Sequence, residues 1–203
     1  DDLRRGKPTT HVAFGEATAV LAGDALHALA FGLLADERTH SDPFVRAEMT
    51  ACLAKAAGPA GMAGGQMMDL VAENSTFDLP TVTRLQQLKT GALITACVEI
   101  GAILGKVTSE GRTSLRGYAH DLGLAFQIAD DILDVEGDEE KAGKALHKDA
   151  KAGKETFLSL MGLERAREQA QMLVDQAKSH LNGYGGEADV LRAIAEYTIA
   201  RDR

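Results

Sequence analysis

The sequence predicts an all-α protein, on three observations. Long segments rich in alanine and leucine lack the alternating β-branched and aromatic runs that are typical of strands. Only four prolines occur among the 203 residues, so few positions interrupt a helix. The hydrophobic content of 45% lets a chain of this length bury a substantial core. We therefore expect a single helical domain that spans residues 1–203.

The periodicity of apolar residues places six helices along the chain. They are expected over residues 13–35, 44–73, 81–104, 109–135, 156–182 and 187–201. The first contains an apolar stretch, residues 17–35, that is long enough to suggest a membrane span. Asp24 and His27 lie near the middle of this stretch, and two such polar side chains favour a buried core helix over a span.

Proline and glycine mark the expected boundaries. Pro43 and Pro80 lie where the first turn of a helix tolerates a missing N–H. The pair Gly58-Pro59 falls inside the second helix and predicts a kink or a break there. The stretch NGYGG at 182–186 separates the last two helices, and the charged segment 136–155 predicts a long mobile loop.

Charge and cysteine content exclude several classes of function. The chain has 22 basic and 30 acidic residues, a net charge of −8, and so lacks the basic field that attracts nucleic acid or anionic membranes. We expect neither as a partner. Cys52 and Cys97 have no CxxC spacing, so a disulfide framework is not expected. The two thiols fit a reducing compartment, and we expect a cytoplasmic protein.

The stretch FQIADDILDV, residues 126–135, places three aspartates in an otherwise apolar helix. On a helical wheel with Asp130 at zero, Asp134 falls at about 40°, Gln127 at about 60° and Asp131 at about 100°. Apolar side chains occupy the rest of the circumference. A helix with so narrow a polar stripe is expected to be buried, with the stripe facing a wet cavity.

Two interpretations of the aspartate stripe remain open from spacing alone. Carboxylates four residues apart repel each other, and Mg²⁺, which takes oxygen ligands from carboxylates and substrate phosphates, would offset the repulsion. Alternatively, the aspartates form caps or ion pairs at an exposed helix end, since Gly137 soon ends the segment.

The same stretch resembles the second aspartate-rich motif, D-D-x-x-D, of the trans-prenyl diphosphate synthases. The opening DDLRRGKPTTH resembles the segment that follows the first aspartate-rich motif of that family. Further matching pieces follow in the family's order: FGEATAVLAGDALHALAF at 14–31, GGQMMDL at 64–70, KTGAL at 89–93, and GK pairs at Lys144 and Lys154. The resemblance spans nearly the whole chain and is to the bacterial short-chain farnesyl diphosphate synthase type.

This resemblance implies the isoprenoid synthase fold, a helical bundle around a central cavity, in a homodimer. It implies condensation of isopentenyl diphosphate with dimethylallyl or geranyl diphosphate, giving farnesyl diphosphate with Mg²⁺ as cofactor. The first aspartate-rich motif, the N-terminal helices and the residues that set product length are expected before residue 1. With half of the metal site upstream, a protein beginning at Asp1 is expected to be inactive.

The resemblance also assigns roles to individual residues. The implied metal ligands, direct or through water, are Asp130, Asp131 and Asp134. The groups expected to stabilise the carbocation are the Thr90 hydroxyl, the Lys89 carbonyl and the Gln127 amide oxygen. The implied diphosphate-binding residues are Arg4, Lys89, Lys144 and Lys154 for the allylic substrate and Arg5 for isopentenyl diphosphate. Gln66 and Asp69 are expected to line the same cavity.

Some residues depart from the family pattern, and several alternatives stay open. The loop carries His147 for an expected glycine, Phe157 for tyrosine and Leu158 for proline, which puts its closed geometry in question. The alternatives are a geranylgeranyl diphosphate synthase, a terpene cyclase or squalene-type synthase, a non-catalytic partner subunit, and a plain helical scaffold. The arginine turn and the GK loop favour chain elongation over cyclisation, because they supply a second diphosphate site.

Overall fold

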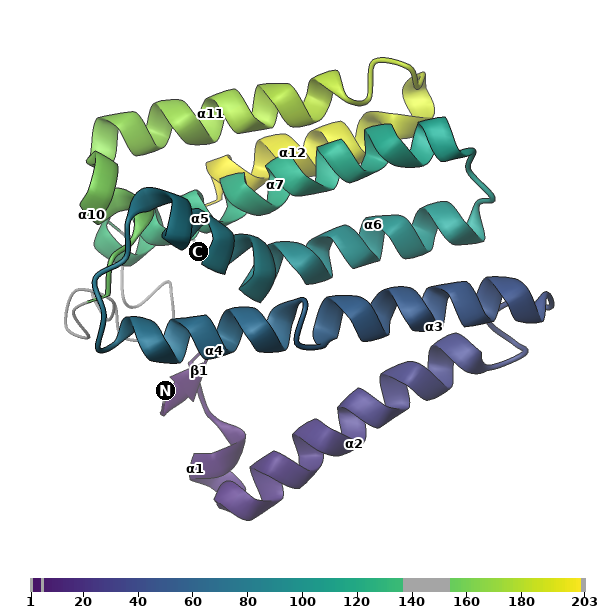
Figure 1. The fold of residues 1–203 in the computed structure, drawn as a ribbon, viewed down its shortest axis with the longest axis horizontal. Coiled ribbons are helices and arrows are strands. Elements are labelled where there is room, and N and C mark those ends of the chain that lie inside the picture. Colours follow the sequence, from purple (N-terminus) through teal and green to yellow (C-terminus); the bar gives the residue numbers. More distant parts are fainter. Residues whose placement is uncertain (1, 5, 137–153, 202–203) are drawn as a thin grey trace.

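The computed structural model describes residues 2–4, 6–136 and 154–201, and it confirms the all-α class (Figure 1). A two-residue hairpin pairs β1 (Leu3–Arg4) with β2 (Lys7–Pro8) in antiparallel register. The helical elements are α1 Thr10–Phe14, α2 Glu16–Ala35, α3 Pro43–Ala57, α4 Met62–Ala72, α5 Leu79–Gln86, the π-helix η1 Gln87–Gly91, α6 Ala92–Leu104, α7 Ser109–Glu136, α10 Phe157–Met161, α11 Leu163–Ser179, the 3₁₀-helix η2 Gly186–Ala188 and α12 Asp189–Ala200.

Local sequence explains most of these boundaries. Asp42 caps α3 by accepting from the Phe44 N–H at 2.9 Å, and Asp78 caps α5 by accepting from the Thr81 N–H at 3.0 Å. A proline occupies the first turn of each of these helices, as expected. The break between α3 and α4 falls at Gly58-Pro59, and this expectation is also confirmed.

Two of the expected helices are divided by glycines in the left-handed region. Gly15 has φ of +87° and separates α1 from α2, while Gly162 has φ of +80° and separates α10 from α11. An L-residue rarely adopts these angles, so each glycine permits a sharp turn between helices. The single helices expected over 13–35 and 156–182 are therefore wrong at these two positions.

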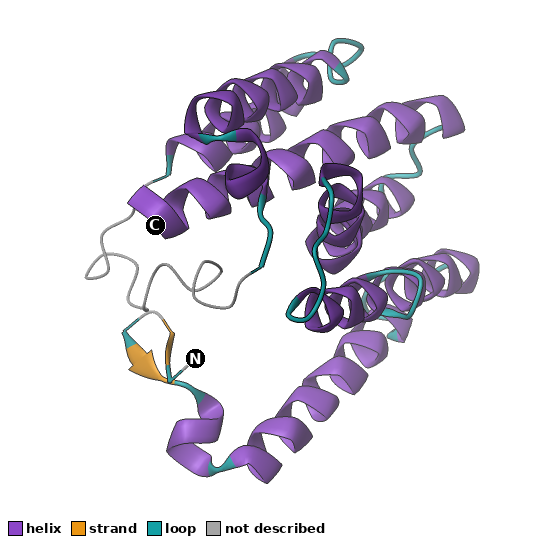
Figure 2. Ribbon diagram, turned by 60° about the vertical axis from the view of Figure 1, so that its left-hand side comes forward, coloured by secondary structure: helices purple, strands orange, loops and turns teal. Residues whose placement is uncertain are grey.

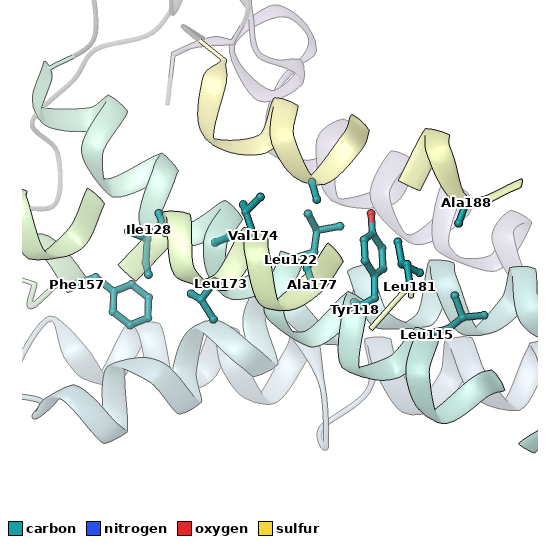
Figure 3. Close-up of a cluster of buried hydrophobic side chains, with 14 of the residues drawn as sticks. Leu115, Tyr118, Leu122, Ile128, Phe157, Leu173, Val174, Ala177, Leu181 and Ala188 are labelled. Carbon is teal, nitrogen blue, oxygen red and sulfur yellow. The ribbon is translucent and has the colours of Figure 1, made fainter. Parts of the chain in front are cut away.

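The core lies between α7, α11 and α12, which pack side by side (Figures 1 and 2). Figure 3 shows its side chains, with the fully buried Tyr118 among leucine, valine and alanine. The Tyr118 hydroxyl donates to the Leu191 carbonyl at 2.8 Å, and burial raises the pKa of this phenol to about 12. Helices α3 and α6 pack beside this core and complete the bundle.

Helix α2 differs from the expectation of a buried core helix. It diverges from the bundle and packs mainly against α1 and α3 (Figures 1 and 2), and none of its residues is buried. Its exposed apolar side chains include Val20, Leu21, Leu26, Leu29 and Leu33. The expectation is wrong because an apolar stretch indicates that a helix needs cover without identifying what covers it. By length and composition, α2 and Leu79–Leu104 could each cross a membrane, a test that core helices of soluble proteins also pass.

Candidate active site

The three aspartates of α7 project to different surroundings. Asp131 is buried, and its Oδ2 accepts a hydrogen bond from the Phe157 backbone N–H at 2.8 Å. Asp130 is partly exposed and forms an ion pair with Arg201. Asp134 is partly exposed and makes no hydrogen bond or ion pair with the described residues. One carboxylate thus anchors the chain, while the other two lie four residues apart along one edge of α7.

Arg201 also belongs to this region, although no sequence motif points to it. It follows α12 directly, and its guanidinium lies over the Phe126 ring at 4.2 Å from the centroid. Its side chain is only 14% exposed, so this cation is held in place beside Asp130. Gln127 completes the group, with its Nε2 donating to Asp130 Oδ2 at 3.4 Å. A lone arginine at the end of a helix carries no spacing signal that connects it with a motif 71 residues earlier.

A second charged cluster gathers around Asp69 on α4. Its Oδ2 accepts from Lys89 Nζ at 2.8 Å and from Lys154 Nζ at 3.0 Å, and Glu73 lies 3.3 Å from Lys154. Burial disfavours the charged carboxylate, but hydrogen bonds from the two lysines outweigh that and lower the pKa of Asp69. Burial likewise opposes the charge of Lys154, yet its bonds to Asp69 and Glu73 raise the pKa of the ammonium.

Lys89 and Thr90 lie on the π-helix between α5 and α6. A π-helix is rare and often marks a functional site, because its wider turn alters which side chains and carbonyls the helix presents. Thr90 is half-buried beside Lys89. Gln66, on the neighbouring α4, is exposed one turn before Asp69.

The structure therefore brings together part of the expected site. Lys89 and Lys154 meet at Asp69, although they are far apart in sequence, and Gln127 meets Asp130. The α7 carboxylates are tied to the Lys154 segment because Asp131 bonds to Phe157, three residues further on. Arg4 lies exposed in the β1–β2 hairpin. Three of the expected residues lie outside the described part of the chain: Arg5, Lys144 and His147.

The loop departures can be followed at their C-terminal end. Phe157 is buried and begins α10, and it packs into the main core with its ring drawn in Figure 3. Thr156 caps α10 by accepting from the Ser159 N–H at 3.1 Å, in a reciprocal capping box. A half-buried Leu158 continues this short helix. Phenylalanine and leucine at these positions therefore serve packing and helix formation.

A family model described as polyprenyl synthetase matches residues 1–196. The chain belongs to this family. The chain is similar to the farnesyl diphosphate synthase of Escherichia coli (strain K12), with 45% identity over all of this chain and 70% of that protein. The farnesyl diphosphate synthase of Geobacillus stearothermophilus is 43% identical over all of this chain and 68% of its own length.

Solved polyprenyl synthetase structures agree with the fold. An FPP/GFPP synthase from Zymomonas mobilis superposes with a TM-score of 0.88 at 58% identity, over 98% of this chain and 66% of that one. A geranyltransferase from Helicobacter pylori, complexed with magnesium and isoprenyl diphosphate, gives 0.84 at 34% identity, over 98% and 65%. The chain thus spans about two thirds of the length of these relatives. The trans-prenyl diphosphate synthase resemblance, of the farnesyl type, is confirmed.

The donor groups on α7 suit a divalent ion that substrate helps to bind. Within the residues that the structure describes, no three side chains of histidine, cysteine, aspartate or glutamate converge on a metal position. Mg²⁺, however, is commonly held by one or two carboxylates together with substrate phosphates and water. Asp130 and Asp134, both partly exposed on one edge of α7, are hard oxygen donors of that kind. Asp131 differs, because its Oδ2 is bound to Phe157.

Proposed function

We propose that this polyprenyl synthetase condenses isopentenyl diphosphate with dimethylallyl or geranyl diphosphate to make farnesyl diphosphate. The observation that carries the proposal is the hydrogen bond from Phe157 to Asp131, which ties the aspartate motif of α7 to the segment of Lys154, the lysine that meets Lys89 at Asp69. Three farnesyl diphosphate synthases that are 42–45% identical over the full chain support the choice of product.

The lysines would bind the leaving diphosphate. Their ammonium groups both donate to one carboxylate oxygen, Asp69 Oδ2. A phosphate oxygen of the substrate would accept from the same two ammonium groups. Lys89 and Lys154 thus form a preorganised pair of cations that substrate phosphates would meet. Arg4 in the exposed hairpin and Lys144 would add further contacts to the allylic diphosphate, and Arg5 would bind isopentenyl diphosphate.

Asp130 and Asp134 would hold Mg²⁺ together with the substrate phosphates, and Asp131 would hold α7 against the Lys154 segment. When bound, the ion supplies positive charge that stabilises the departing diphosphate. The magnesium in the Helicobacter pylori geranyltransferase structure supports this choice of metal. Arg201 supplies part of the compensating charge at Asp130.

Dipoles rather than cations would stabilise the carbocation that forms when the allylic diphosphate ionises. Thr90, the Lys89 carbonyl and the Gln127 amide oxygen would present partial negative charge to the cation. Gln127 is buried and its Nε2 points to Asp130, which fixes the orientation of its amide. The new carbon–carbon bond would form when the isopentenyl double bond attacks the cation, and loss of a proton would restore neutrality.

The decisive experiment incubates the full-length protein with isopentenyl and geranyl diphosphates, with and without Mg²⁺, and separates the products by liquid chromatography with mass detection. We expect a fifteen-carbon diphosphate only when Mg²⁺ is present. A twenty-carbon product would favour the alternative of a geranylgeranyl diphosphate synthase, which relatives such as that of Cyanophora paradoxa support at 39% identity. No elongation of any allylic diphosphate would contradict the proposal and favour a non-catalytic subunit.

We also propose a homodimer in the cytoplasm. The row of exposed leucine and valine side chains on α2 needs cover in water, and a second copy of the chain could supply it. The two free cysteines support a cytoplasmic location.

A further inference from the structure

The π-helix that carries Lys89 and Thr90 is in backbone contact with α4. Gly65 of α4 is buried against it. A Cβ atom placed on Gly65 would lie 2.2 Å from the Lys89 backbone nitrogen, 2.6 Å from the Lys89 Cα and 2.8 Å from the Leu88 carbonyl carbon. All three distances are shorter than any real Cβ contact. No other residue type fits at position 65 unless α4 or the π-helix moves.

The π-helix is also confined on its opposite side. Gly123 of α7 faces Gly91, and a Cβ at position 123 would lie 3.2 Å from the Gly91 Cα. The turn is therefore held between two helices that each approach it through a glycine. The π-helix cannot relieve a clash with a side chain at position 65 by moving toward α7, because it is already in close contact with Gly123 there.

Helix α4 also determines where the Lys89 ammonium lies. Asp69 follows Gly65 by four residues and so lies on the same face of α4. Its carboxylate accepts from Lys89 Nζ at 2.8 Å. One face of α4 thus contacts the Lys89 backbone at Gly65 and binds the Lys89 ammonium at Asp69, so both the backbone and the side-chain end of Lys89 are held in place.

We propose that Gly65 is a positioning residue, which places the Lys89 side chain for the reaction by allowing α4 to approach the π-helix at backbone distance. The inference rests on the proposed prenyl transfer and names a residue that acts on it through Lys89. Displacing a reactive group by about 1 Å can lower turnover about a hundred-fold. We therefore expect Gly65→Ala to lower kcat by about that factor.

The test compares four forms of the full-length protein: wild type, Gly65→Ala, Lys89→Ala and the double variant. If Gly65 acts through Lys89, the Gly65→Ala change should lower kcat strongly in the wild-type background and hardly at all in Lys89→Ala. The KM for the allylic diphosphate should rise, and the KM for isopentenyl diphosphate should stay unchanged. Equal losses in both backgrounds, or unchanged turnover, would overturn the inference.

Gly101→Ala is the matched control, because this glycine lies in α6 with nothing within 4 Å of an added Cβ. It should leave kcat unchanged. If Gly65→Ala does not fold, Gly123→Ala presses on the same turn from α7 with a milder 3.2 Å contact. That variant should show a smaller loss of kcat that also disappears in the Lys89→Ala background, and an additive loss would overturn the inference. Wild-type protein without prenyl transfer would contradict the proposed function itself, a result distinct from either outcome.

Discussion

The buried carboxylate of Asp131 accepts a hydrogen bond from the backbone N–H of Phe157 at 2.8 Å, and this bond joins the end of α7 to the start of α10. Asp131 and Asp134 belong to the same motif, yet only the first is buried and bonded in this way. The difference separates a role in folding from a role in binding, and the two can be measured independently.

Asp131→Ala should destabilise the protein. The variant leaves the buried Phe157 N–H without its acceptor, which costs about 1–3 kcal/mol of the free energy of unfolding. Urea denaturation followed by circular dichroism measures this cost. Asp134→Ala is the comparison and should leave the denaturation midpoint unchanged while lowering Mg²⁺-dependent turnover. Equal destabilisation by both changes would contradict the division of roles.

Removing Arg201 should strengthen the response to Mg²⁺. Arg201 pairs with Asp130 and would therefore compete with a metal ion for that carboxylate. In Arg201→Ala we expect the Mg²⁺ concentration for half-maximal activity to fall several-fold. Arg201→Lys keeps the charge and should stay near the wild-type value. A higher Mg²⁺ requirement in the alanine variant would show that the arginine assists the metal instead.

The Asp69 cluster should contribute a pH-dependent part of the stability. Because the folded-state pKa of Asp69 lies below its ordinary value of 3.8, its contribution is complete above that pH and is lost as the pH falls through 3.8 toward the folded value. The difference in unfolding free energy between wild type and Asp69→Asn should be constant from pH 7 to about pH 5 and shrink below about pH 4. A difference that grows on acidification would contradict the sign.

The exposed face of α2 should control association. Leu26 is 66% exposed, and a glutamate there would place a charge in any apolar interface that covers this helix. We expect Leu26→Glu to shift the mass measured by light scattering from dimer to monomer. Glu37→Gln, in the turn that follows α2, is the control and should leave the mass unchanged. A monomeric wild type would rule out the proposed dimer.

Sequence reasoning predicted the helices well where one physical rule dominated. The apolar period fixed 109–135 to within a residue of α7, and Pro43 fixed the start of α3. It failed at Gly15 and Gly162, because a glycine inside a periodic run does not reveal whether its φ is positive. It also failed for the burial of α2, since an apolar stretch shows that a helix needs cover without identifying its neighbour.

For the candidate site too, sequence reasoning identified residues within local motifs and missed contacts between distant parts of the chain. Helical spacing drew attention to the three aspartates, and the family resemblance selected Lys89 and Lys154, because each lies within a short local motif. Neither selected Arg201, and neither could show that Asp131 bonds to Phe157. Both contacts join residues that are distant in the chain and depend on how the helices pack. Tests for such residues must come from coordinates.

The Tyr118 hydroxyl bond to Leu191 gives α12 a second point of attachment to α7, about 18 Å along the helix from Asp130 at 1.5 Å per residue. Because Arg201, the residue directly after α12, places its cation at Asp130, α12 is attached to α7 near both of its ends. Tyr118→Phe removes the hydrogen bond to the Leu191 carbonyl and would allow α12, with Arg201 at its end, to shift relative to Asp130. Substrate affinity could then change through a residue that never meets a ligand.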